Sequence, residues 1–132
     1  MILVDSNVWI DLIRKDPVWF EWSSQHIERA YFADQVVTNP VIYAELAPIY
    51  DSPQELVDFF QSGETPVAPF SPACCYVAGR AFLKYRQSRG GKTGVLPDFF
   101  IGAQAQTEGW TILTRDKARY KTYFPKVKLI CP

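Results

Sequence analysis

Short apolar segments alternate with longer amphipathic segments along the chain. Five short runs are rich in apolar residues, and no polar residue interrupts most of them. Their length and composition are typical of buried strands. They are residues 2–4, 36–38, 67–70, 110–114 and 127–130. The longer segments repeat apolar residues at helical spacing and begin or end at Ser, Asp, Pro or Gly. The expected helices cover residues 7–15, 18–33, 40–50, 52–63, 71–88, 98–108 and 116–123.

The order of these segments predicts the fold. Strands that alternate with helices form a parallel sheet whose two faces are covered by helices. We therefore expect a three-layer α/β/α protein with a central parallel sheet of five strands. The chain has 132 residues and contains no repeat or linker, so residues 1–132 are expected to form one domain.

Composition narrows the class of protein. Hydrophobic residues make up 48% of the chain, which is enough for a folded core, and no apolar run approaches the length of a membrane span. The first residues do not resemble a signal peptide, because Asp5 and Asn7 interrupt the apolar stretch. A cytoplasmic protein is therefore expected. Its cysteines, Cys74, Cys75 and Cys131, are expected to be buried apolar residues and not metal ligands.

The charges are unevenly distributed although the net charge is +0. Residues 1–64 contain 11 acidic and 3 basic residues, whereas residues 65–132 contain 3 acidic and 11 basic residues. Such a basic half is compatible with a nucleic-acid surface. Chance segregation along a chain that folds back on itself would give the same pattern.

Acidic residues stand at the junctions between the expected elements. Asp5 ends the first strand, Asp116 follows the fourth strand, and Asp98 begins a helix. Glu45 lies one to two turns into the helix that follows the second strand. Ligand sites in parallel sheets lie beyond the carboxyl ends of the strands, so these four acids are expected to lie close together.

Carboxylates that converge in this way need a cation. Two unit charges about 4 Å apart repel by about 4 kcal/mol at an effective dielectric constant near 20. Oxygen ligands favour hard ions, so Mg²⁺ or Mn²⁺ is expected, and such an ion suits phosphodiester hydrolysis. Taken singly, Asp98 and Asp116 could instead be helix N-caps and Glu45 a solvated residue. Asp5 is harder to account for structurally, because it directly follows a buried strand.

Four segments together resemble one family. The segments ILVDSNVWIDL, YAEL, LPDFFIGAQA and ILTRDKARYKTYFP look like the successive motifs of PIN-domain nucleases, most of all the VapC-type toxins of toxin–antitoxin pairs. The resemblance implies a PIN-like fold and Mg²⁺- or Mn²⁺-dependent endoribonuclease activity on RNA, with transfer RNA as one candidate substrate. It also implies a homodimer and a VapB-like antitoxin partner.

The resemblance also assigns roles to residues. It places the catalytic and metal-binding acids at Asp5, Glu45, Asp98 and Asp116. Three neighbouring polar residues are expected to fix the orientation of these carboxylates without binding the metal ion themselves. They are Ser6, Asn7 and Thr114.

Basic residues near the expected site are candidates for RNA contacts. The loop GGKTG at 90–94 resembles a phosphate-binding loop, but the full pattern needs a glycine at Arg86 and a preceding strand. We expect instead a basic loop that contacts RNA phosphates through Arg86, Arg89 and Lys92, with Arg115 as a further contact. A plain solvated loop is the alternative.

The stretch VWFEW at 18–22 is unusually aromatic. These side chains could pack in the core, or they could form a surface that binds the antitoxin. We expect Trp9, Trp19, Phe20 and Trp22 to contribute to such a surface.

Two other functions remain open at this point. One is a non-catalytic module whose acidic edge binds an antitoxin arginine in a repressor complex. The other is an RNA-processing nuclease without an antitoxin. Aspartyl-phosphatase chemistry at DSNVW (5–9) is disfavoured, because Asn7 stands where that chemistry needs a second aspartate.

Overall fold

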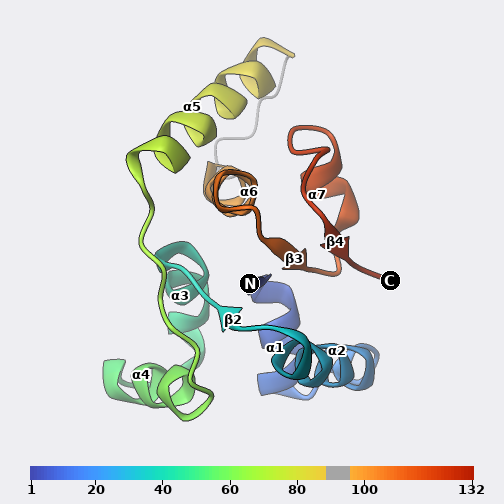
Figure 1. The fold of residues 1–132 in the computed structure, drawn as a ribbon. Coiled ribbons are helices and arrows are strands. Elements are labelled where there is room, and N and C mark those ends of the chain that lie inside the picture. The colour runs from blue at the N-terminus through green and yellow to red at the C-terminus, as the bar shows by residue number, and fades with distance from the viewer. Residues whose placement is uncertain (89–95) are drawn as a thin grey trace.

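The computed structural model describes residues 1–88 and 96–132, and the strands in these ranges form one parallel sheet. The strands are β1 (Ile2–Val4), β2 (Val36–Val37), β3 (Thr111–Leu113) and β4 (Leu129–Ile130), in the spatial order β2-β1-β3-β4. β1 pairs in parallel with both β2 and β3, and β3 pairs in parallel with β4 (Figure 1). The carboxyl ends of the strands consequently share one edge of the sheet.

The expected strand at 67–70 is reduced to a single bridge. Val67 forms an isolated parallel bridge with Thr38, where Ala68 N donates to Thr38 O at 2.8 Å. Pro66 and Pro69 flank this bridge and have no N–H group to extend the ladder. The sheet therefore has four strands and not the predicted five, and the segment 67–70 contributes only this bridge beside β2.

The helices follow the predicted order with small shifts at their ends. They are α1 (Ser6–Arg14), α2 (Phe20–Ala33), α3 (Pro40–Leu46), the 3-10 helix η1 (Ala47–Ile49), α4 (Pro53–Ser62), α5 (Pro72–Gln87), α6 (Leu96–Glu108) and α7 (Lys117–Lys121). The largest difference concerns the helix expected at 40–50. It narrows to a 3-10 turn after Leu46, because Pro48 has no N–H group for the α-helical ladder.

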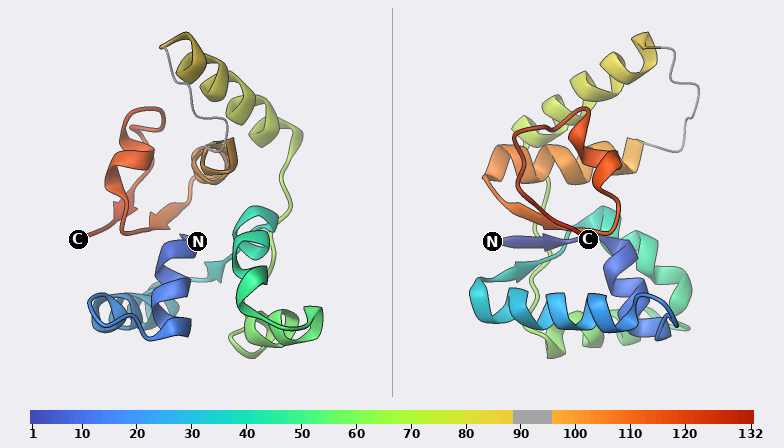
Figure 2. Two further views of the ribbon diagram at one scale, coloured as in Figure 1. Left: turned by 180° about the vertical axis from the view of Figure 1, so that it is seen from behind. Right: turned by 90° about the vertical axis from the view of Figure 1, so that its right-hand side faces the viewer.

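Helices cover both faces of the sheet, which confirms the predicted three-layer α/β/α fold. Figure 1 shows α5, α6 and α7 on one side of the strands and α1, α2 and α4 on the other. The side view in Figure 2 shows the same layers with the sheet between them. In that view α1 and α6 both begin at the side toward which β1 points.

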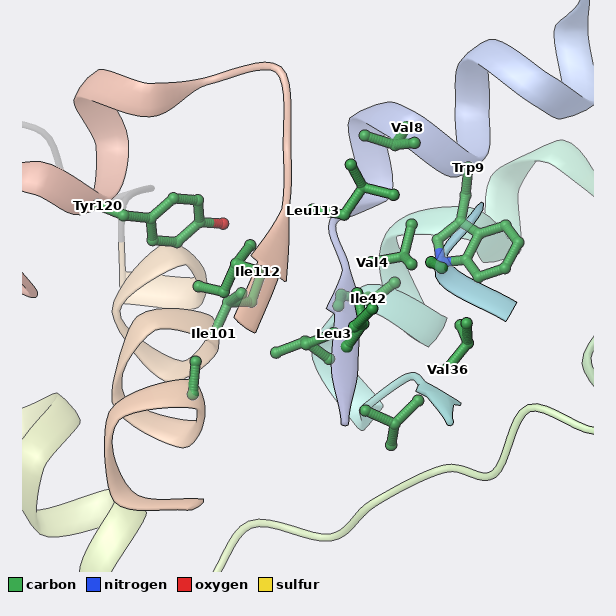
Figure 3. Packing of buried hydrophobic residues seen from close by; sticks show 14 of the residues in the cluster. Leu3, Val4, Val8, Trp9, Val36, Ile42, Ile101, Ile112, Leu113 and Tyr120 are labelled. Carbon is green, nitrogen blue, oxygen red and sulfur yellow. The ribbon is translucent and has the colours of Figure 1, made fainter. Parts of the chain in front are cut away.

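The core fills the space on both sides of the sheet. Leu3 and Ile112 are fully buried, and Figure 3 shows Ile101 of α6 facing them. The fit of α6 depends on Gly102, because a Cβ atom there would lie 2.2 Å from the ring of Phe124. Only glycine at this position allows the C-terminal segment to pack closely against α6.

Two expectations about other residues can be compared with the structure. Cys74 is buried as expected, whereas Cys75 is exposed and Cys131 is intermediate, so the expectation was wrong for Cys75. Cys75 follows Cys74 on α5 and therefore points to a different side of the helix. Among the helices of the described ranges, none is long and apolar enough to cross a membrane.

Candidate functional site

Asp5 is the centre of the site and has no exposed surface. It follows β1 and is the N-cap of α1, where its Oδ1 accepts a hydrogen bond from Ser6 N at 2.8 Å. Its Oδ2 accepts hydrogen bonds from the Thr114 hydroxyl at 2.8 Å and the Tyr120 hydroxyl at 2.9 Å. These neutral donors fix the orientation of the carboxylate without neutralising its charge.

Arg119 lies among three of the predicted acids. Its Nη1 atom is 3.6 Å from Asp5 Oδ2 and 3.3 Å from Asp98 Oδ1. Its Nε atom is 3.4 Å from Asp116 Oδ2. The pKa of the Arg119 guanidinium is raised because the charges of nearby acids, Asp5 foremost, outweigh its burial, which acts in the opposite direction. One monovalent cation is therefore shared by three carboxylates.

Glu45 approaches the same edge from α3. Desolvation raises the pKa of its carboxyl, and the charges of Asp5 and Asp98 raise the pKa further. A side-chain hydrogen bond with Ser6 and the charge of Arg119 act in the opposite direction. The residue as a whole is nevertheless exposed, so part of Glu45 remains accessible to solvent.

A buried amide pair sets the position of α3. Asn39 caps the helix through its Oδ1, which accepts from Ile42 N at 2.8 Å, and its Nδ2 donates to Gln104 Oε1 at 3.0 Å. Gln104 belongs to α6, and its Nε2 donates to the carbonyl oxygens of Ala68 and Pro69 at 3.3 and 3.2 Å. The helix that bears Glu45 is thus linked to the helix that bears Asp98.

Asp98 and Asp116 differ in their environments. Desolvation raises the pKa of Asp98, and the charges of Asp5 and Asp116 add to this effect, while Arg119 lowers the pKa. Asp116 is more exposed and caps α7, where its Oδ1 accepts from Arg119 N at 3.2 Å. The capping role that the sequence suggested for Asp116 is therefore present together with its ion pair.

The predicted supporting residues surround Asp5. Besides Ser6 and Thr114, Asn7 Nδ2 lies 3.5 Å from Asp5 Oδ2 and 3.4 Å from Thr114 Oγ1. Thr114 Oγ1 also accepts a hydrogen bond from Asp116 N at 3.0 Å. The same threonine hydroxyl thereby connects Asp5 to the backbone at Asp116, and the orienting role of Thr114 stays a prediction.

The site offers a hard cation only oxygen ligands, which is the chemistry of Mg²⁺ and Mn²⁺. As the side chains stand, however, residues 1–88 and 96–132 contain no group of three or more His, Cys, Asp or Glu side chains arranged to hold a metal ion. Arg119 lies between the carboxylates and acts as a stand-in for a bound cation. The residues therefore fit a divalent ion by charge and ligand type, provided that the guanidinium moves.

Of the predicted RNA-contacting residues, the structure describes Arg86 and Arg115. Arg89 and Lys92, with the GGKTG loop, lie outside the described residues. Arg86 is exposed near the end of α5, with its guanidinium carbon 5.9 Å from the Phe82 ring centroid. Arg115 makes an ion pair with the buried Asp11 and lies over the Trp19 ring at 5.1 Å. The structure therefore gives Arg115 a packing contact that the sequence did not predict.

The expectation for Trp9 was wrong. Its side chain is 2% exposed and packs edge-on against Phe59 and Phe60 of α4, so it cannot form part of a surface (Figure 3). Val8 and Trp9 point to different sides of α1, and both are covered because the helix packs against α2 and α3 while Trp9 meets the two phenylalanines of α4. Trp19, Phe20 and Trp22 are not fully buried, which leaves the prediction for them untested.

Sequence reasoning missed Arg119 and Tyr120. Arg119 stands three residues after Asp116, and such a pair meets on one face of a helix, so the spacing was an available signal. Tyr120 had no comparable signal. Its hydroxyl reaches Asp5 because the ring is buried between α7 and the sheet, as Figure 3 shows, and burial raises its pKa so that the hydroxyl stays protonated.

Fold and site together define an α/β protein with an acidic site at the carboxyl edge of a parallel sheet. The sequence model of the PIN domain matches residues 2–125, and the chain belongs to the PIN domain family. PIN domains are generally nucleases. Comparison with curated protein sequences gives no match.

Solved structures of similar fold support this assignment. A chain of the VapBC2 complex from Rickettsia felis, bound to a promoter DNA fragment, is 21% identical, with a TM-score of 0.75 over 100% of this chain and 99% of that chain. A chain of FitAcB from Neisseria gonorrhoeae is 20% identical, with a TM-score of 0.67 over 98% and 96% of the two chains. A chain of VapBC-1 from nontypeable Haemophilus influenzae is 15% identical, with a TM-score of 0.72 over 99% and 98%.

Proposed function

We propose that this PIN domain is a Mg²⁺- or Mn²⁺-dependent endoribonuclease and the toxin of a toxin–antitoxin pair. The observation that carries the proposal is the convergence of Asp5, Asp98 and Asp116 around one guanidinium, with Glu45 close enough for the charges of Asp5 and Asp98 to raise its pKa. These acids come from four separate segments. Such a concentration of negative charge is costly in a folded protein unless it serves to bind a cation.

The side chains at this edge of the sheet would have different roles in the proposed reaction. Asp5, Glu45 and Asp98 would hold the ion, and Asp116 would complete the site from the start of α7. A divalent ion held there would supply Lewis-acid stabilisation of the charge that develops on a phosphodiester. Thr114 and Tyr120 hold the Asp5 carboxylate in place through their hydroxyl groups, and Asn7 supports Thr114.

The similar structures suggest which partners to propose for this chain. The resembling chains occur in VapBC and FitAB complexes, some of them bound to DNA. We therefore expect a VapB-like antitoxin as partner, a homodimer as the working unit, and cellular RNA, including transfer RNA, as substrate in the cytoplasm. Trp19, Phe20 and Trp22 are the candidate antitoxin contacts, and Arg86, Arg89 and Lys92 are candidate RNA contacts.

The nuclease proposal can be tested with the purified chain and total RNA. We expect cleavage in Mg²⁺ or Mn²⁺ and none in EDTA. Asp98→Asn should lower the cleavage rate at least about 100-fold, because it removes a ligand charge from the site. The matched control is Asp51→Asn, which changes an exposed aspartate that lies just before α4.

Two results would contradict the proposal. Cleavage that is unaffected by EDTA, or equally strong in Asp98→Asn, would exclude metal-dependent catalysis at this edge. A chain that binds a co-expressed antitoxin but cleaves no RNA in either metal would instead favour the non-catalytic module. Mapping of RNA 5′ ends after brief expression of wild type and Asp98→Asn identifies the substrate.

A further inference from the structure

A cleft of about 300 Å³ opens directly beside the acidic edge. Asp98, Asp116 and Arg119 form one part of its wall, so the cleft is continuous with the site. The remaining lining residues come from α5, α6, α7 and the turn that follows α7, and they are Tyr85, Phe99, Ala118, Thr122 and Tyr123. Its volume lies at the lower end of the range of small-ligand sites.

Three aromatic side chains, Tyr85, Phe99 and Tyr123, contribute to the lining of the cleft. Phe99 lies edge-on to Tyr123, with ring centroids 5.1 Å apart, and Tyr85 lies 6.0 Å from Tyr123. Phe99 is buried, whereas Tyr85 and Tyr123 are both partly exposed. The rings are steeply inclined to one another, by 63° for Phe99 and Tyr123 and 74° for Tyr85 and Tyr123, so Phe99 and Tyr85 support the Tyr123 ring from its sides and a flat ligand would stack on Tyr123 alone.

We infer that this cleft binds one nucleobase of the RNA substrate, stacked on Tyr123, next to the phosphate at the acidic edge. The inference rests on the proposed ribonuclease function and adds a base-binding subsite to it. Proteins recognise single-stranded RNA by stacking unpaired bases on aromatic side chains, and every base offers a suitable face.

The position of Arg119 also bears on the occupant. Its side chain is 28% exposed and lines the cleft together with Asp98 and Asp116, so the cleft reaches the place where a phosphate would meet a metal ion held by these acids. A nucleotide placed with its base on Tyr123 would bring its phosphate toward this end of the cleft. The Thr122 side chain adds a hydroxyl that can donate to or accept from a base edge.

A larger cleft of about 450 Å³ is the main alternative for RNA binding. It lies along α5 and is lined by Arg80, Lys84 and the exposed Tyr76, among others. It shares Tyr123 with the smaller cleft, but it includes none of the four acids or Arg119. The base nearest the reacting phosphate is therefore assigned to the smaller cleft.

The test is equilibrium binding of five-nucleotide RNAs, each with an abasic ribose at one position, measured in Ca²⁺ to neutralise the acidic edge, with electrophoresis to verify that the RNA stays intact. In the wild type, loss of one particular base should weaken binding about 5- to 150-fold, the effect of removing one stacked base. Loss of the other bases should matter less. Tyr123→Leu should remove this position dependence, and Tyr123→Phe should retain it.

Two further variants test whether the smaller cleft itself causes the position dependence. Thr122→Trp fills this cleft from an exposed position, so it should abolish the position dependence even if Tyr123→Leu fails to fold. Tyr76→Leu removes an exposed ring of the larger cleft and should behave as wild type. Loss of position dependence in Tyr76→Leu alone would place the base in the larger cleft and overturn the inference.

The RNA-binding test and the nuclease test can fail independently of each other. Wild type that cleaves RNA but binds all abasic RNAs equally, or binds none at millimolar concentration, would overturn the subsite and leave the proposed function standing. Position-dependent binding without cleavage in Mg²⁺ or Mn²⁺ would overturn the proposed function and leave the subsite standing.

Discussion

Two aspartates near the N-terminus are equally buried and are stabilised in different ways. Asp11 is 1% exposed and receives a bidentate contact from Arg115, at 2.7 Å from Nε and 3.0 Å from Nη2. The Ser23 hydroxyl donates to it as well, at 2.6 Å. Its charge is therefore fully paired inside the protein.

Asp5 has hydrogen bonds but little compensating charge. Its close partners are the hydroxyl groups of Thr114 and Tyr120 and the backbone N–H of Ser6, and Arg119 comes no closer than 3.6 Å. That guanidinium is also shared with Asp98 and Asp116. The comparison separates a carboxylate whose charge is fully paired from one that shares a single guanidinium with two other acids, and the second kind is the one that we propose to bind a metal ion.

The largest effect is expected from breaking the ion pair between Arg115 and Asp11. Arg115→Met should lower the free energy of unfolding by about 3–5 kcal/mol, because it leaves the Asp11 charge buried without a partner. Urea unfolding followed by circular dichroism measures this change. In the background of Asp11→Asn the same Arg115→Met substitution should cost much less, and an equal cost in both backgrounds would show that the ion pair does not stabilise the fold.

Arg119→Met should cost less, about 1 kcal/mol without metal, because Asp5 keeps its neutral donors. The same substitution should tighten Mn²⁺ binding about tenfold, since a competing positive charge is removed from the carboxylates. Urea unfolding and calorimetric titration with Mn²⁺ measure the two effects. Lys117→Met, which removes an exposed charge from the same helix, is the matched control. Weaker Mn²⁺ binding in Arg119→Met than in this control would contradict the stand-in role of Arg119.

Tyr120→Phe removes one hydroxyl donor from Asp5 and should lower the free energy of unfolding by about 1 kcal/mol. It should also slow RNA cleavage, because the Asp5 carboxylate loses part of its fixed orientation. Tyr76→Phe, at an exposed position, should change neither quantity. Unchanged stability and cleavage in Tyr120→Phe would mean that Thr114 and Ser6 alone position Asp5.

The smallest effect concerns pH. Burial and neighbouring carboxylates raise the pKa values of Glu45 and Asp98 in the folded state. Between an ordinary carboxyl pKa of about 4 and these raised pKa values, the folded protein binds more protons than the unfolded chain. The free energy of unfolding without metal should therefore fall as pH rises through this range. Thermal unfolding between about pH 4 and 7 would reveal it, and Asp98→Asn should flatten the profile relative to Asp51→Asn. A steeper profile in Asp98→Asn would contradict the assigned cause.

The parts of the fold that depend on local pattern were predicted well. The positions of β1 and β3, and of helices that begin at Pro40, Pro53 and Pro72, agree with the expectation, because hydrophobic period, proline and capping residues act within a few residues. The prediction of a strand at 67–70 was wrong, and the reason also lies in the local sequence. Its two prolines remove N–H groups, and this effect outweighed the apolar character of the segment.

The sequence located the acids of the candidate site but not the cation and the tyrosine that meet them. Asp5 and Thr114 could be placed because each directly follows a strand, and Asp98 and Asp116 because each lies at the start of a helix. The partners of Arg115 could not be placed, since its guanidinium contacts a residue 104 positions earlier in the chain. Nor could the burial of Trp9, which depends on two phenylalanines of α4.

The sequence by itself determined the alternation of strands and helices and the position of the acids at strand ends and helix starts, because both depend on short-range hydrogen bonding and side-chain period. Only the tertiary structure decided which charges meet. The Thr114 and Tyr120 hydroxyls reach Asp5 across separations of 109 and 115 residues, and Arg119 enters the acidic edge through the docking of α7. Such contacts depend on how distant segments pack, and no local pattern specifies them.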